Sequence, residues 1–251
     1  FPLSSTLGSI GTFTRSAHDA AQVYAALAGT PVPPAPTLAE LRLGHLRNPP
    51  FDDVSADVAQ CLDAALARLR DAGVAIVPVD VPEAAEVDTV FLPMLPAELL
   101  AHLGIERVRA NADVLDPMVS KRLEPAMRQS SAEYIAIRER QRALCAIAAE
   151  RMRGLDGWVC ATTPDTAVRV ADYATVDRAS AWVRRAVGPT RPVNLFGQCA
   201  CSIPIGSPGV ALPVGLQVVC AAGQDAALLA IAQGIEDRVG RAPRADVAAF
   251  A

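Results

Sequence analysis

The side chains that could do chemistry in this sequence are few and scattered. The one lysine, Lys121, lies in a polar stretch with helical character, and the serine pairs Ser4-Ser5 and Ser130-Ser131 have no glycines beside them. A serine nucleophile needs a base that takes its proton and backbone N–H groups that bind the oxyanion. The sequence around these residues predicts neither. We therefore assign no catalytic residue and interpret Lys121 as a solvated surface lysine.

Arg191 is the residue whose type suits substrate recognition best. It lies beside a loop that contains Asn194, and a guanidinium can hold a carboxylate through two parallel hydrogen bonds. We predict that Arg191 binds a carboxylate of the substrate. The alternative is that Arg191 satisfies backbone carbonyl groups nearby. Asn194 is expected to fix the loop rather than to bind substrate.

The cysteines and histidines do not form a metal-binding pattern. The six cysteines stand at positions 61, 145, 160, 199, 201 and 220, and the three histidines at 18, 45 and 102. Cys199 and Cys201 are spaced to share one face of a strand, which differs from the Cys-x-x-Cys spacing of zinc and redox sites. We expect six buried, reduced thiols, no metal and no cofactor.

Composition excludes several classes of function. The net charge of −4 gives no basic surface for nucleic acid. The sequence shows neither a signal peptide nor an apolar run of the ~18–20 residues that a membrane span needs. We therefore expect a cytoplasmic protein without nucleic-acid or membrane partners.

Periodicity predicts alternating helices and strands. Ser16 and Asp19 form a capping-box pattern before a helix that ends at Gly29, and a proline-rich connector covers 30–37. Residues 41–80 predict a strand, a helix capped by Ser55 and a second, parallel strand. Residues 84–153 predict short helices broken by prolines 93, 96, 117 and 125. A hairpin over 198–205 and 212–220 and a helix capped by Asp225 follow. The expected fold is α/β, a mixed β-sheet covered by helices.

Two segments carry a resemblance to a known family. Pro2-Leu3-Ser4 and Arg15-Ser16 before an alanine-rich helix form the first. The second reads Thr-Arg-Pro-Val-Asn-Leu-Phe-Gly over 190–197, Ser-Ile-Pro over 202–204 and Leu-Pro-Val-Gly-Leu-Gln-Val-Val over 212–219. Together they resemble the amidase signature family, with Gly8 and Thr12 as departures. The matching segments cover about a third of the chain.

The resemblance implies an amide hydrolase that acts through a serine nucleophile, a second serine in a cis peptide and a lysine. The Gly/Ser-rich loop that carries these serines does not occur in the 251 residues. The resemblance therefore implies that 1–251 is the C-terminal part of a single amidase-signature domain, incomplete for catalysis. It also implies that the segment before Pro164 reaches the pocket, which makes Thr163 a substrate-binding candidate.

Two functions remain open at this point. The chain is either part of a hydrolase that cleaves the C–N bond of a small-molecule amide, or a non-catalytic paralogue that acts as a binding or regulatory partner. Val187-Gly188-Pro189 stands where tRNA-dependent amidotransferases of the family carry an Asp, which favours a small-molecule amidase. The expected partners are the amide substrate and a second copy of the chain in a homodimer.

Overall fold

The computed structural model describes residues 2–173 and 175–240. Within them the strands form one mixed five-stranded sheet in the order β2-β1-β3-β5-β4, which confirms the predicted α/β fold. The strands are β1 (Arg42–Leu46), β2 (Ala75–Val79), β3 (Gly157–Ala161), β4 (Cys199–Ile205) and β5 (Val214–Cys220). The β1 strand pairs in parallel with β2 and β3, and β5 pairs antiparallel with β3 and β4.

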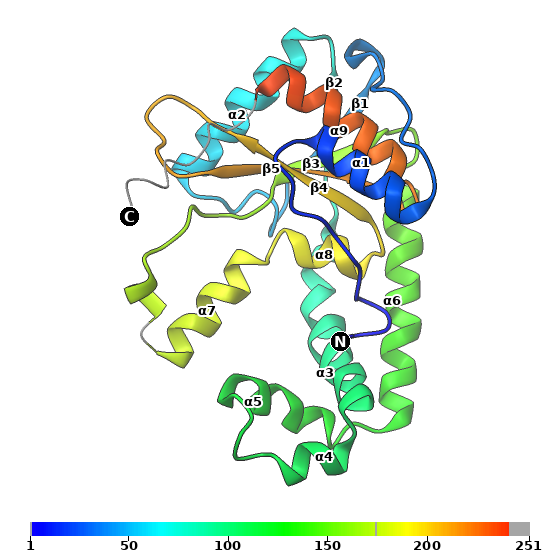
Figure 1. Ribbon diagram of the computed structural model, residues 1–251, viewed down its shortest axis with the longest axis vertical. Helices are drawn as coiled ribbons and strands as arrows, with labels where there is room; N and C mark the ends of the chain where they lie inside the picture. Colours follow the sequence, from blue (N-terminus) through cyan, green and yellow to red (C-terminus); the bar gives the residue numbers. More distant parts are fainter. Residues whose placement is uncertain (1, 174, 241–251) are drawn as a thin grey trace.

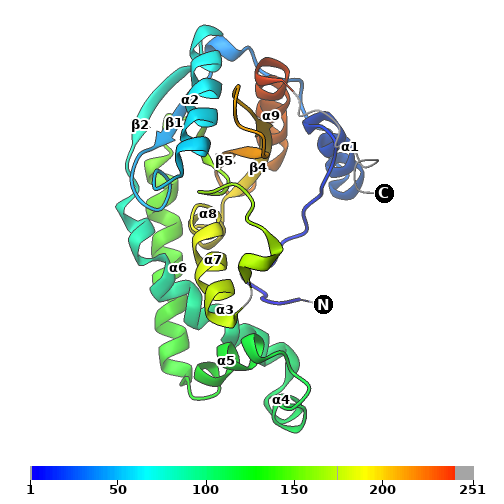
Figure 2. The same ribbon diagram turned by 90° about the vertical axis from the view of Figure 1, so that its left-hand side faces the viewer.

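Helices cover both faces of the sheet (Figures 1 and 2). The α-helices are α1 (Ala17–Ala28), α2 (Ala56–Asp71), α3 (Val87–Leu103), α4 (Ile105–Ala110), α5 (Pro117–Ala126), α6 (Ser131–Arg151), α7 (Val176–Ala186), α8 (Thr190–Leu195) and α9 (Asp225–Val239). Short 3-10 helices cover Leu38–Glu40, Pro82–Glu86 and Val170–Tyr173. One core cluster lies between the sheet and α2 and α9, and a second lies between the sheet and α3, α6 and α8.

The predicted strand-helix-strand unit is confirmed. Leu43 and Leu46 of β1 are fully buried, and α2 packs its predicted apolar face against the sheet. Gly44 lets β1 lie close to its neighbours, because a Cβ there would stand 2.8 Å from Val79 Cγ2 and 2.9 Å from Trp158 Cδ1. A larger residue at this position would crowd the side chains of Val79 and Trp158.

The expectation that proline breaks the 84–153 region into short pieces is wrong for its first part. Pro93 and Pro96 both lie inside the 17-residue helix α3. Each proline removes one helical hydrogen bond. The helix persists because Val90 and Met94 are buried in the core cluster that α6 shares. Tertiary packing therefore outweighs local propensity here.

Two of the expected helix caps also differ. Ser55 occupies the position before α2, but its hydroxyl is buried without a hydrogen-bond partner among the described residues. Asp225 is the first residue of α9, and Gln224 stands at the cap. Ser16 does cap α1, accepting from the Asp19 N–H at 3.1 Å. A full capping box forms at Ser130 before α6.

The cysteines are less uniformly buried than expected. All six are unpaired, but only those at 61, 160 and 220 are buried, and those at 145, 199 and 201 are half-buried. Cys199 and Cys201 do face the same side of β4, toward the cluster under α9. Their sulfur atoms therefore belong to the packing of the core.

Candidate functional site

A cavity of about 450 Å³ lies where the loops after β1 and β3 meet α7 and α8. Because β1 and β3 are parallel, the loops at their carboxyl ends lie at the same edge of the sheet, where open α/β sheets commonly bind ligands. The start of α3 adds a third wall. The polar residues that line the cavity are Asp53, Asp88, Arg184, Arg185 and Arg191, and the other lining residues are 49, 50, 84, 85, 87, 164, 181, 188 and 192.

Arg191 lies in the first turn of α8, and its side chain lines this cavity. Its backbone N–H donates to the Val187 carbonyl at 2.9 Å, and its Nη1 donates to Asp88 Oδ1. The guanidinium carbon also lies 5.2 Å from the centre of the Phe91 ring, within cation–π range. The Arg191 side chain is 11% exposed. Within residues 2–173 and 175–240, Asp88 is the hydrogen-bond partner of this guanidinium, so the alternative of a backbone-carbonyl partner does not hold.

Arg185 ties the cavity walls together. Its Nη1 donates to Asp53 Oδ2 at 2.9 Å, and its Nε and Nη2 both donate to the Asp165 carboxylate. Hydrogen bonding to Asp165 and then to Asp53 raises the pKa of Arg185. One side chain of α7 therefore joins the loop after β1 to the loop after β3.

Thr163 does not line the cavity. Its Oγ1 donates to the Asp165 carbonyl at 3.0 Å, and the next residue, Pro164, forms the wall. The Pro164 carbonyl accepts from the Ser55 N–H at 2.8 Å. Thr163 thus shapes the turn that places Asp165 against Arg185.

The residue before Thr163 belongs to a second polar arrangement. Thr162 Oγ1 lies 2.6 Å from Ser202 Oγ, and both hydroxyls stand over Gly215. A Cβ at Gly215 would lie 2.5 Å from Ser202 Oγ and 2.7 Å from Thr162 Oγ1. The absence of a side chain at Gly215 of β5 therefore leaves room for the Thr162 hydroxyl, directly after β3, and the Ser202 hydroxyl of β4 to lie together.

The serines and the lysine that sequence analysis considered have other roles. Ser4 is buried and its hydroxyl donates to the Glu98 carboxylate. Ser130 caps α6, and Lys121 is exposed on α5. Ser4 therefore binds the Glu98 carboxylate, and Ser130 caps the N-terminus of α6.

Sequence reasoning missed the acidic partners of the cavity. Asp88 and Asp165 carry no local motif; Asp88 lies 103 residues from Arg191, and Asp165 lies 20 residues from Arg185. The adjacent arginines 184 and 185 in an amphipathic helix were the one signal that could have drawn attention to α7.

Two negative findings apply to the part of the chain that the structure describes. No three His, Cys, Asp or Glu side chains there are placed to hold a metal ion. In the same residues, every helix is too short or too polar to cross a membrane.

Comparisons with known proteins give the same family by sequence and by fold. A family model described as Amidase matches residues 1–229. The 2-amino-5-chloromuconic acid deaminase of Comamonas testosteroni is 33% identical over 246 residues, 96% of this chain and 53% of that protein. The mandelamide hydrolase of Pseudomonas putida is 28% identical, over 96% of this chain and 52% of that protein. The chain thus spans about half the length of these relatives.

Solved structures show the same fold. A structure described as the crystal structure of amidase superposes with a TM-score of 0.79 at 22% identity, covering 95% of this chain and 55% of that one. Since the family model accounts for most of the sequence and the fold is that of a solved amidase, the chain belongs to the amidase family.

Proposed function

We propose that this chain is part of a hydrolase that cleaves the C–N bond of a small-molecule amide through a serine nucleophile, and that residues 1–251 do not contain that nucleophile. Family membership supports amide hydrolysis. The engagement of Ser4 with Glu98 and of Ser130 with the start of α6 supports a nucleophile from elsewhere. The chain's part is then to form a wall of the substrate site.

The observation that carries this proposal is the arginine-lined cavity. Arg191 presents a guanidinium that is nearly buried yet reaches a wall of the cavity, and Arg184 adds a second cation to the lining. A guanidinium in such a place favours a carboxylate over a neutral group. The relative from Comamonas testosteroni is named for an acid substrate, which agrees with this choice. We propose a carboxylated amide as substrate, with Arg191 binding its carboxylate.

Thr163 is proposed to act on substrate binding through the turn that it forms. Its hydrogen bond to the Asp165 carbonyl supports the placement of Pro164 at the cavity wall. We further propose that the protein is cytoplasmic and forms a homodimer. Light scattering on a sizing column tests the homodimer, and fractionation of cells that express the protein tests the location.

The test of the proposed reaction compares two proteins. The 251-residue chain alone should release no ammonia from a panel of amides, because loss of a nucleophilic serine alone costs about 10⁶ in turnover in a serine protease. The same chain joined to the N-terminal half of the Comamonas testosteroni relative should release ammonia and be labelled by a fluorophosphonate at a serine of the added half.

The outcomes separate the two candidate functions. Labelling of a serine within residues 1–251 would refute the proposed division of roles. A folded chimera that binds carboxylated amides but releases no ammonia would instead favour the non-catalytic binding partner.

A further inference from the structure

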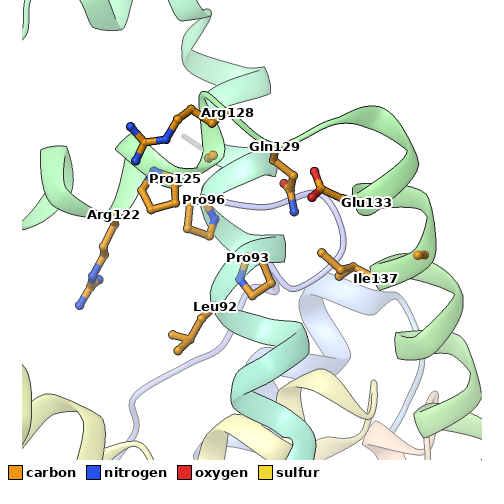
Figure 3. Close-up of a pocket in the computed structure, with 11 residues that line it drawn as sticks. Leu92, Pro93, Pro96, Arg122, Pro125, Arg128, Gln129, Glu133 and Ile137 are labelled. Carbon is orange, nitrogen blue, oxygen red and sulfur yellow. The ribbon is translucent and has the colours of Figure 1, made fainter.

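A second cavity, of about 560 Å³, lies away from the sheet among α3, α5 and α6. In Figure 3 helix α3 forms its floor, with α5 on one side and α6 on the other. Most of its lining is apolar, from three prolines at 93, 96 and 125 and from Leu92, Ile137 and two alanines. Such a lining suits an aromatic or short alkyl group.

The polar end of this cavity accepts hydrogen bonds. Gln129 Oε1 is buried and has no hydrogen-bond partner among the described residues. Beside it, the Glu133 carboxylate uses one oxygen to accept from the Ser130 N–H and hydroxyl, at 2.7 and 2.8 Å. Figure 3 shows the Gln129 and Glu133 side chains pointing toward one another. A buried acceptor without a partner is unfavourable, so this end is suited to a donor group.

The floor adds no competing donors. Pro93 and Pro96 have no N–H group, so the helix face that they occupy can offer only carbonyl oxygens and ring carbons. The cavity therefore combines an apolar floor with acceptors at one end, which is the complement of an apolar molecule that carries an amine.

The two arginines of the lining do not reverse this preference. Arg128 pairs with Glu124 at 3.0 Å, which balances its charge. Arg122 is exposed, and in Figure 3 its side chain extends away from Gln129 and Glu133. The field of an exposed charge is screened by salt. Glu133 is also exposed, but its carboxylate lies beside Gln129, and the hydrogen bonds from Ser130 lower its pKa.

We propose that this cavity is a binding site for a small amphipathic amine, with its apolar body on Pro93 and Pro96 and its ammonium group on Gln129 Oε1 and the Glu133 carboxylate. The site is separate from the cavity of Arg191 and does not depend on the proposed amide hydrolysis. Benzylamine is a suitable probe, because it is protonated at pH 7 and its ring fits an apolar floor.

The experiment titrates the isotope-labelled chain with benzylamine and with phenylacetate, which has a similar body and the opposite charge. Benzylamine should shift the backbone amide signals of Ala126 and Ala136, and phenylacetate should not. Gln129→Leu and Glu133→Gln should each weaken benzylamine binding at least fivefold. Glu139→Gln removes the same charge from α6 outside the cavity and should leave the affinity unchanged.

The variants also show whether the cavity prefers a cationic or an anionic ligand. Arg122→Ala should leave benzylamine binding unchanged or strengthen it. Tighter binding of phenylacetate, lost in Arg122→Ala, would overturn the proposal in favour of an anion site. Equal losses in Gln129→Leu and Glu139→Gln, or no benzylamine shifts at the cavity, would also overturn it. Gln129→Leu leaves the capping box intact, so the test does not depend on how well Glu133→Gln folds.

Discussion

Arg191 and Asp88 stand 103 residues apart in the chain, and their side chains form an ion pair in the wall of one cavity. Asp88 is 42% exposed, whereas Arg191 is 11% exposed. The carboxylate therefore lies on the solvent side of the pair and the guanidinium on the protein side. Asp88 engages only Nη1 of the guanidinium. Under the proposed function, a substrate carboxylate on Arg191 would share or displace this contact, so we expect Asp88 to compete with the substrate.

This competition predicts opposite effects of two substitutions. Asp88→Asn should strengthen binding of a carboxylated amide such as succinamate by about tenfold, because the competing charge is gone. Arg191→Ala should weaken it by about 10- to 100-fold, since a charge-assisted hydrogen bond contributes roughly 1.5–3 kcal/mol. Calorimetry on the purified chain gives both affinities. Neutral succinamide is the control, and equal changes for both ligands would assign Arg191 to loop structure.

A second prediction concerns the buried carboxylate of Glu98, which is 4% exposed. Burial opposes its ionisation, but hydrogen bonds from Ser4, Thr6 and Tyr134 outweigh burial and hold the pKa of Glu98 below its usual range. The Thr6 and Tyr134 hydroxyls donate at 2.6 and 2.7 Å. Since the folded pKa is below the unfolded one, this stabilisation is present above the unfolded pKa of about 4.3 and is lost as the pH falls through the folded pKa.

Glu98→Gln should therefore lower the free energy of unfolding at pH 7 by about 1–3 kcal/mol, as expected when charged hydrogen bonds are lost. The difference from the parent chain should shrink as the pH falls below 4. Urea titrations at a series of pH values measure it. Glu40→Gln, at an exposed position, is the control and should change neither the free energy of unfolding nor its pH dependence. A difference between Glu98→Gln and the parent chain that stays constant at every pH would show that the Glu98 charge is not responsible.

The third prediction tests the close approach at Gly215. Gly215→Ala places a methyl group against the hydroxyls of Thr162 and Ser202, and overpacking of this kind costs about 1–3 kcal/mol. Gly206→Ala is the matched control, because a Cβ there meets nothing within 4 Å. Thermal unfolding of both variants gives the comparison, and an equal effect at the two positions would contradict the proposed crowding.

A fourth prediction concerns the exposed apolar side chains before α1 and the edge strand β4. The β4 strand ends the sheet order, and Ile10 and Phe13, in the segment before α1, are 93% and 108% exposed. Unpaired strand edges and exposed apolar groups favour association. The chain should self-associate or bind a hydrophobic dye in its native state. Replacing Ile10 and Phe13 by Ser should reduce the dye signal, whereas a monodisperse parent chain without dye binding would contradict the prediction.

Sequence patterns correctly predicted the elements that pack against neighbours close to them in the chain. The unit from Leu41 to Val79 and the hairpin of β4 and β5 follow from strand alternation, a helical apolar face and glycine ends. Helix α3 could not be predicted, because contacts with α6 stabilise it despite Pro93 and Pro96. Local sequence shows only the helix propensity of these residues. The contacts that stabilise α3 come from residues some 50 positions away, which local sequence does not reveal.

The site was predictable in part for the same reason. Arg191 has a side chain whose chemistry is visible in isolation, and it does line the cavity. Thr163 was placed at the cavity by resemblance, but its neighbour Pro164 forms the wall. Asp88 and Asp165 acquire their roles only when the fold brings them to arginines 191 and 185, which no spacing along the chain reveals.

The placement of the cysteines has a practical consequence for handling the protein. Burial raises the pKa of the Cys160 and Cys220 thiols to about 12, and burial likewise raises those of Cys199 and Cys201 to about 11. At neutral pH only about one in 10⁴ or fewer of these groups is a thiolate, the form that reacts with alkylating reagents and disulfides. These four thiols of the folded chain should therefore react slowly with air and with maleimide reagents, and their rapid labelling would report unfolding.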